Sequence, residues 1–238
     1  MLELVISKLK ESPELLSYDY VDSNGYPVFY QSDENREIGI RGGNLYKCRI
    51  NRIGCGIFFN HVEKFLLRPK KFSVDEYSTI ETYNHSYHSG YEFGVSIFDH
   101  FPILFDKESD VEKAFNLYRK FIEQDAIPFF NYWTDITVLI PYLETGFFEP
   151  DNYKALSGDW VVKRAIIWYQ TSHPKFEEYY QFHMERYESL FETRPRDEKD
   201  IKKAIKKMNT VYKKLKNSDP LYEWDPAFLI KKPFVSAD

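Results

Sequence analysis

The stretch from Ser109 to Phe148 constrains the fold more than any other part of the chain. It contains two segments of helical periodicity that meet near Pro128, and both are rich in aromatic and aliphatic residues. Ser109 and Glu112 have the spacing of a capping box, which marks a helix start. Pro141 lies inside the second segment, where a proline predicts a kink or an early break. We therefore expect a helix pair at the centre of the fold.

Alternating segments before this helix pair predict β-strands. A short amphipathic helix over residues 2–11 comes first. Polar or glycine-containing turns separate the segments that follow it. The predicted strands are Tyr26–Gln31, Glu37–Arg41, Leu45–Asn51, Ile57–Leu67 with a break near Asn60, and Glu92–Phe98. Alternation of apolar and polar residues favours an antiparallel sheet with one covered face.

Helical patterns follow the central pair. One runs from Ser157 to about Thr171, a second has Pro174 just inside its start, and the third covers about Asp197–Asn217 with the cleanest apolar stripe in the chain. The last residues include Trp224 and Phe228, which predict a docked tail because such side chains are poorly placed in free solvent.

These elements together predict an α+β protein. We expect an N-terminal antiparallel sheet with helices packed on one face, followed by a helical C-terminal region. The expected division is an α+β domain over residues 1–150 and a helical region over residues 151–238 that packs on it, with the docked tail at its end.

Acidic residues are concentrated in the middle of the chain. The net charge is −5, but residues 75–160 alone carry 16 acidic and 5 basic residues. Such a block can be a solvated surface, or it can attract a basic partner or a cation. We expect the outer face of the helix pair to take part in a partner surface. The candidate binding residues are Asp110, Glu112, Glu123, Asp125, Asp135 and Glu144.

Four residues on either side of the predicted strand Glu92–Phe98 form the best metal-ligand candidate. His85 and His88 have ligand-like spacing in a polar segment, and Asp99 and His100 follow the predicted strand Glu92–Phe98. Imidazole and carboxylate groups suit zinc or another divalent metal. The alternative is that these are surface residues of a polar, aromatic loop. A metal-dependent hydrolase is thus one alternative function.

Lysines dominate one face of the last predicted helix, opposite its apolar stripe. A basic stripe can bind nucleic acid by displacing counterions, or it can be a solvated helix face. The acidic central block argues against a general nucleic-acid binder. The lysines are Lys199, Lys202, Lys203, Lys206, Lys207, Lys213, Lys214 and Lys216.

Motifs of common enzyme classes do not occur in the sequence. It has no phosphate-binding loop, no Gly-x-Ser-x-Gly elbow and no His-Glu-x-x-His helix. We therefore expect a protein without a cofactor, and we favour a non-enzymatic function. The first residues lack the features of a secretory signal, and no apolar run is long enough to span a membrane. Together these features predict a soluble, cytoplasmic protein.

The order of elements carries a resemblance. A helix, several antiparallel strands and then a helix with the sequence Ile127-Pro128-Phe129-Phe130-Asn131-Tyr132-Trp133 resemble a group of domains of unknown function from Bacteroidetes and related bacteria. The resemblance covers about residues 1–146. Some proteins of this layout are similar to immunity proteins of contact-dependent or polymorphic toxin systems. The resemblance implies a non-catalytic binding protein and carries over no active-site residue.

We therefore predict a bacterial cytoplasmic protein that binds a protein partner without catalysis. The expected partner has a basic surface, and the acidic block over residues 75–160 is expected to bind it. An immunity-like role is one form of this function. Hydrolysis with a bound metal and nucleic-acid binding through the last helix are the alternatives.

Overall fold

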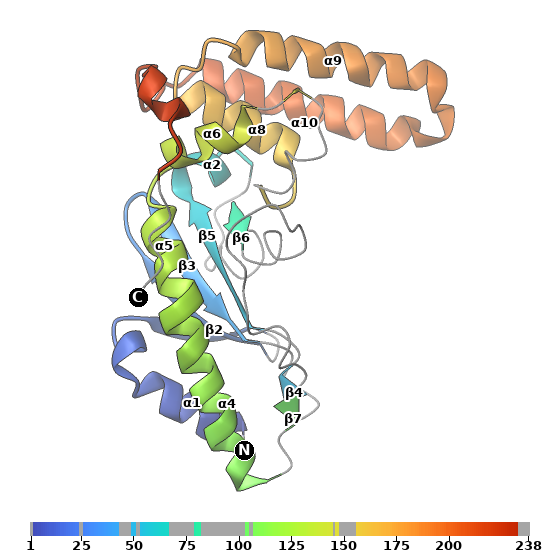
Figure 1. Ribbon diagram of the computed structural model, residues 1–238. Helices are drawn as coiled ribbons and strands as arrows, with labels where there is room; N and C mark the ends of the chain where they lie inside the picture. The colour runs from blue at the N-terminus through green and yellow to red at the C-terminus, as the bar shows by residue number, and fades with distance from the viewer. Residues whose placement is uncertain are drawn as a thin grey trace.

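Figure 1 shows the protein as a computed structural model in which an N-terminal sheet is followed by helices. The described residues are 2–23, 26–42, 49–50, 53–66, 79–81, 103–104, 107–144, 146–147 and 156–232. The chain begins with helix α1 (Leu2–Lys10) and the 3-10 turn η1 (Pro13–Leu15). Helix α1 packs against the central helix, where Lys8 pairs with Glu112.

Five strands form one antiparallel sheet in the order β1-β2-β3-β5-β6. Strands β4 and β7 form a separate antiparallel pair. The fold class is thus the α+β class expected from the alternating segments. The strands are β1 (Asp19–Ser23), β2 (Tyr26–Ser32), β3 (Arg36–Arg41), β4 (Arg49–Ile50), β5 (Gly54–Phe59), β6 (Ile80–Glu81) and β7 (Ile103–Leu104).

The break expected near Asn60 is confirmed, but the strand expected between this break and Leu67 is wrong. The chain turns there into helix α2 (Asn60–Glu63). Asn60 causes the change of direction, because its backbone N–H donates to Asn35 O at 2.9 Å and its side chain donates to the turn between β2 and β3. The expected strand Glu92–Phe98 and most of Leu45–Asn51 lie outside the described residues.

One continuous helix replaces the turn expected near Pro128. It consists of α4 (Glu108–Phe121), the π-helical turn η3 (Ile122–Ala126) and α5 (Ile127–Tyr132). Proline lacks an N–H and crowds the preceding turn, and the wider π-helical turn just before Pro128 accommodates both effects. The capping box at the start is also different from the expected one, since Asp110 Oδ2 accepts from Lys107 N at 3.0 Å.

The break expected near Pro141 lies earlier, after Tyr132. Asp135 begins a new turn there by accepting from Thr137 N at 2.8 Å. The turn η4 (Ile136–Leu139) and helix α6 (Ile140–Leu143) follow. Pro141 lies in the first turn of α6, where a missing N–H breaks no helical hydrogen bond.

Three longer helices form the C-terminal region: α8 (Trp160–Gln170), α9 (Phe176–Thr193) and α10 (Glu198–Lys216). Helix α8 is buried along most of its length, including its charged residues Lys163 and Arg164. Helices α9 and α10 are antiparallel and connected by η5 (Pro195–Asp197), and this hairpin extends past α8 on one side of the molecule (Figure 1). We call the α9–α10 hairpin the arm.

A single hydrophobic cluster contains side chains from the sheet, the continuous helix and the C-terminal helices. Helix α4 comes close to the sheet at Gly42, where a Cβ atom would clash with the Tyr118 hydroxyl and the Pro27 ring. In the described part of the chain, no helix combines the length and the apolar character needed to cross a membrane.

The segment after α10 runs back over the body and includes η6 (Pro226–Leu229). The backbone N–H groups of Leu221 and Tyr222 both donate to Gln170 O at the end of α8, at 3.0 and 2.9 Å. Ser172 Oγ donates to Tyr222 O at 2.7 Å. Backbone hydrogen bonds thus hold this segment against the end of α8.

Candidate functional site

A buried ion pair joins the sheet region to the C-terminal helices. Lys163 Nζ on α8 lies 2.7 Å from Glu63 Oε1 on α2. Thr79 Oγ1 donates to the same carboxylate oxygen at 2.9 Å and accepts from Phe59 N at 3.0 Å. Burial raises the pKa of Glu63, and the adjacent Lys163 ammonium opposes that rise. This network links three segments of the chain, which indicates a role in stability.

A second buried cluster contains a histidine and a carboxylate. His173 Nε2 lies 2.7 Å from Glu144 Oε1, and Lys175 N donates to His173 Nδ1 at 3.1 Å. Burial alone would raise the pKa of Glu144, but the hydrogen bond from His173 and the positive charges of Lys175 and Arg164 hold the pKa below its usual value. Because both ring nitrogens have protein partners, His173 is not placed to take a proton from a substrate.

Aromatic rings surround this histidine. Trp168 stacks on His173 with ring centroids 4.1 Å apart, and Trp224 contacts it edge-on at 4.4 Å. The Arg164 guanidinium lies 4.2 Å from the Trp168 ring centroid and donates to Gly146 O at 3.2 Å. Arg164 is fully buried, so its charge is stabilised by the ring faces and not by water. The cluster is a packed part of the core.

His183 is a second buried histidine with a structural environment. Its Nε2 lies 3.1 Å from Phe147 O, and Trp160 and Tyr179 contact its ring edge-on. Burial, assisted by the positive charges of Arg164 and Arg186, lowers the pKa of His183 to about 4. His183 is therefore neutral at physiological pH and donates from Nε2 to the carbonyl.

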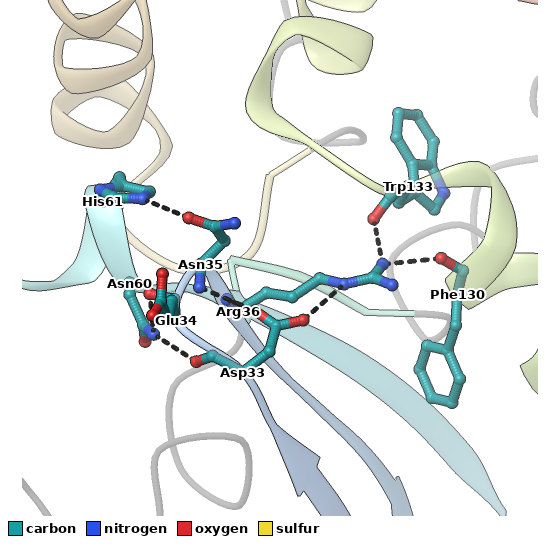
Figure 2. A network of polar contacts seen from close by, with 8 residues as sticks. All are labelled: Asp33, Glu34, Asn35, Arg36, Asn60, His61, Phe130 and Trp133. Atoms are coloured by element: carbon teal, nitrogen blue, oxygen red, sulfur yellow. Dashed lines mark hydrogen bonds and ion pairs between the residues drawn. The ribbon is translucent and has the colours of Figure 1, made fainter. Parts of the chain in front are cut away.

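A polar network connects the turn between β2 and β3 to two helices (Figure 2). Arg36 Nη1 donates to Phe130 O at 2.7 Å and to Trp133 O at 2.9 Å, and so binds the C-terminal carbonyls of α5. On the other side of the turn, His61 Nε2 lies 3.0 Å from Asn35 Oδ1. Burial and the nearby Lys64 lower the pKa of His61. The network therefore positions α5 and α2 relative to the turn between β2 and β3.

The acidic residues expected to form a partner surface lie far apart. Asp110 is in the first turn of α4, and Glu144 follows α6. The continuous helix over 108–132 alone is roughly 37 Å long at a rise of about 1.5 Å per residue. Helices α4 and α6 lie in different parts of the molecule in Figure 1. The structure therefore does not bring the six residues into one compact patch.

Most of these acidic side chains have partners inside the chain. Glu112 pairs with Lys8, and Glu123 pairs with Arg119 at 2.8 Å. Asp110 and Asp135 cap helical turns, and Tyr222 also donates to Asp135. Glu144 is bound to His173. Part of their negative charge is thus neutralised by contacts within the protein.

Asp125 differs from the other five. Its Oδ2 is buried and has no hydrogen-bond partner among the described residues. Burial raises the pKa of Asp125 to about 6, although the positive charge of Lys120 opposes the rise. The residue lies in the π-helical turn η3, and its side chain is half-buried.

His85, His88, Asp99 and His100 lie outside the described residues, so the proposed metal site stays a prediction. Within the described ranges, no group of three or more histidine, cysteine, aspartate or glutamate residues has a metal-binding arrangement.

The lysines of α10 divide into two groups. Four have partners: Lys207 pairs with Asp159, Lys216 with Glu177 and Lys202 with Glu198, and Lys214 donates to Phe65 O. The other four are exposed and form no ion pair with any described residue. These four are Lys199, Lys203, Lys206 and Lys213.

Helix α9 carries an acidic stripe that the sequence interpretation did not single out. Glu178, Glu185, Glu188 and Glu192 are all exposed and follow one another at helical spacing. In the described structure none of them lies within ion-pair distance of a basic group. The spacing was readable in the sequence. We call these four residues the α9 acidic stripe, and Lys199, Lys203, Lys206 and Lys213 the α10 basic stripe.

Comparison with protein-family models, with curated proteins and with solved structures found no match for this chain.

Proposed function

We propose that this protein is a non-catalytic protein-binding module that uses an acidic surface to bind a partner with a basic surface. The observation that supports the proposal is the α9 acidic stripe. Its four carboxylates are exposed and have no basic partner among the described residues. Carboxylates in such a row attract a basic surface over a distance of about 10 Å at moderate ionic strength.

The buried titratable groups support a binding role over a catalytic one. Glu63 is bound by Lys163 and Thr79, and His173 has partners at both ring nitrogens. His183 is held neutral against a backbone carbonyl. These buried groups stabilise the fold. The exposed carboxylates at helical spacing are those of the α9 acidic stripe, on the arm.

Charge reversal tests the location of the binding surface. The binding variant carries Glu185→Lys, Glu188→Lys and Glu192→Lys. The control variant carries Glu108→Lys, Glu112→Lys and Glu123→Lys, which changes the net charge equally but alters exposed positions of α4 and η3. The probe is a synthetic lysine-rich amphipathic helical peptide with a fluorescent label, titrated with each protein at low salt.

We expect the binding variant to weaken peptide binding by at least about tenfold, and the control variant to weaken it by less than about threefold. Binding of the native protein should also weaken steeply as salt is raised, because exposed charges are screened. Equal losses for both variants would show that only net charge matters. Binding that is insensitive to salt and to both variants would contradict the proposal.

A further inference from the structure

Helix α10 has an exposed face on which the charged residues are lysines. Lys199, Lys206 and Lys213 are seven residues apart, so they lie along one line of the helix at intervals of about 10 Å. The fourth lysine of the α10 basic stripe lies beside this line. The two acidic residues of α10, Glu198 and Asp200, project about 100° to either side of Lys199. The stripe is therefore a row of positive charges about 21 Å long.

The contacts of other lysines show which way this face points. Lys207 and Lys214 bind groups of the body next to α8 and α2, and Lys216 binds α9. The α10 basic stripe occupies the helix surface between these two sets of contacts, on the arm that extends past α8 (Figure 1). Its side chains are exposed and form no ion pair within the described part of the chain. This row of charge is therefore accessible to another molecule.

The residue types on this face favour one class of ligand. Its cations are all lysines, which bind phosphate as point charges, whereas bidentate binding of a carboxylate requires arginine. The face has no aromatic residue that could stack on an unpaired base. The apolar residues of α10 lie on the opposite side, buried or half-buried, so the helix has no free apolar face to insert into lipid. These features match the phosphate backbone of a nucleic-acid duplex.

We propose that the α10 basic stripe binds the phosphate backbone of a nucleic-acid duplex without reading its base sequence. One strand of a duplex carries a phosphate about every 3.4 Å along the axis, so a row of lysines about 21 Å long can contact several phosphates at once. Each lysine that neutralises a phosphate releases counterions, and this release drives binding. The surface is separate from the α9 acidic stripe, so the inference goes beyond the proposed function.

Acidic groups elsewhere in the chain do not cancel this row of charge. The acidic central block argued against nucleic-acid binding, but Glu112, Glu123 and Glu144 have basic partners inside the protein. The α9 acidic stripe lies on the neighbouring helix, and the axes of packed helices are about 8–10 Å apart. That separation is close to the screening length at physiological ionic strength, so salt reduces the opposing field. The stripe therefore attracts an anionic polymer although the net charge of the chain is −5.

Fluorescence anisotropy of a short, labelled, mixed-sequence DNA duplex, titrated with the full chain at several salt concentrations, tests the inference. With four lysine–phosphate contacts, the logarithm of the association constant should fall with the logarithm of salt concentration at a slope of about −3.6. The stripe variant carries Lys206→Gln and Lys213→Gln, and glutamine keeps a similar helix propensity. This variant should bind at least about tenfold more weakly at low salt, with the slope reduced in magnitude by about 1.8.

A matched control separates the stripe from net charge. Lys113→Gln and Lys120→Gln remove two exposed lysines from α4 and change the net charge by the same amount. The control should bind less than about twofold more weakly than the native protein, with an unchanged slope. Circular dichroism of each variant confirms that the helices are intact. Equal losses in the two variants, or no duplex binding by the native protein at low salt, would overturn the inference.

Three further ligands identify the kind of polyanion: an RNA duplex of the same sequence, polyglutamate, and vesicles that contain anionic lipid. Binding of either duplex through the stripe supports the inference, and the ratio of the two affinities shows which form is preferred. Binding of polyglutamate or vesicles but of neither duplex would overturn it. The stripe variant should still bind the lysine-rich peptide through the α9 acidic stripe. Failure of duplex binding therefore leaves the proposed function standing, and failure of peptide binding leaves this inference standing.

Discussion

Lys163 and Glu63 form an ion pair in which the two side chains are only 5% and 1% exposed. They come from α8 and α2, so the pair connects the helical region to the end of β5. Removing two charges from water is costly, and their attraction offsets that cost only while both partners remain. Each of the two buried charges is therefore stabilised only while its partner is present.

Removing one partner should be more harmful than removing both. We expect Lys163→Met to lower the free energy of unfolding by about 3–5 kcal/mol, since the Glu63 carboxylate is then buried without its ammonium partner. The double variant Glu63→Leu and Lys163→Met should lose less than this single variant. Urea unfolding followed by circular dichroism measures both. Lys202→Met is a suitable control, because its exposed pair with Glu198 should contribute less than about 1 kcal/mol.

Asp125 should make the protein more stable in acid than it otherwise would be. Its pKa is about 6 in the folded state, compared with 3.8 for an unperturbed aspartate. Between these values the folded protein holds a proton that the unfolded chain has released, so stability falls as pH rises from about 4 to about 6. Asp125→Asn should remove this slope. Thermal unfolding across that pH range measures it, and an unchanged slope in the variant would contradict the assignment.

His183 should act in the opposite direction. Its pKa is about 4 when folded, compared with 6.5 for an unperturbed histidine. Below pH 6.5 the unfolded chain binds a proton that the folded protein excludes, so this residue lowers stability as pH falls toward 4. In His183→Gln, which retains a donor for Phe147 O, stability should fall less over the same range. Comparing the two variants at matched pH separates the contributions, because their slopes have opposite signs.

Local patterns in the sequence were sufficient for elements with one covered face. The alternation over Tyr26–Gln31 corresponds to β2, and the apolar stripe over Asp197–Asn217 corresponds to α10 within one residue at each end. Elements determined by distant contacts were not predictable in this way. The break near Asn60 was expected, but helix α2 after it depends on hydrogen bonds to the β2–β3 turn, and the continuous helix through Pro128 depends on a π-helical turn.

The α9 acidic stripe was missed for a physical reason. A count over residues 161–196 gives six basic and five acidic residues, which suggests a neutral segment. The count includes Lys163 and Arg164, which are buried in α8 and contribute little to the surface. The acidic residues of the same segment are exposed on α9. The net charge of this segment therefore concealed the α9 acidic stripe, although the spacing of its residues is present in the sequence.

Arg36 should stabilise the end of α5. Its guanidinium donates to two carbonyls that have no helical partner, and Asp33 lies 3.7 Å away. Arg36→Gln removes the forked donor, and we expect a loss of about 1–3 kcal/mol because the carbonyls lose their hydrogen bonds. Arg36→Lys should recover only part of it, since an ammonium lacks the planar geometry. Hydrogen exchange should increase at the α5 amides, and unaltered exchange would contradict this role.

Gln170 offers a substitution that should increase stability. Its side chain is 1% exposed, and both amide atoms lack a hydrogen-bond partner among the described residues. Burial of an unsatisfied amide costs about 1–3 kcal/mol. Methionine has a similar length and no such cost, so Gln170→Met should raise the free energy of unfolding by about 1 kcal/mol. The backbone carbonyl of residue 170 still accepts from Leu221 and Tyr222, so the following segment remains attached. Urea unfolding measures the change, with Gln181→Met on the exposed face of α9 as the control. A loss of stability in Gln170→Met alone would mean that the native amide is satisfied by hydrogen bonds to buried water.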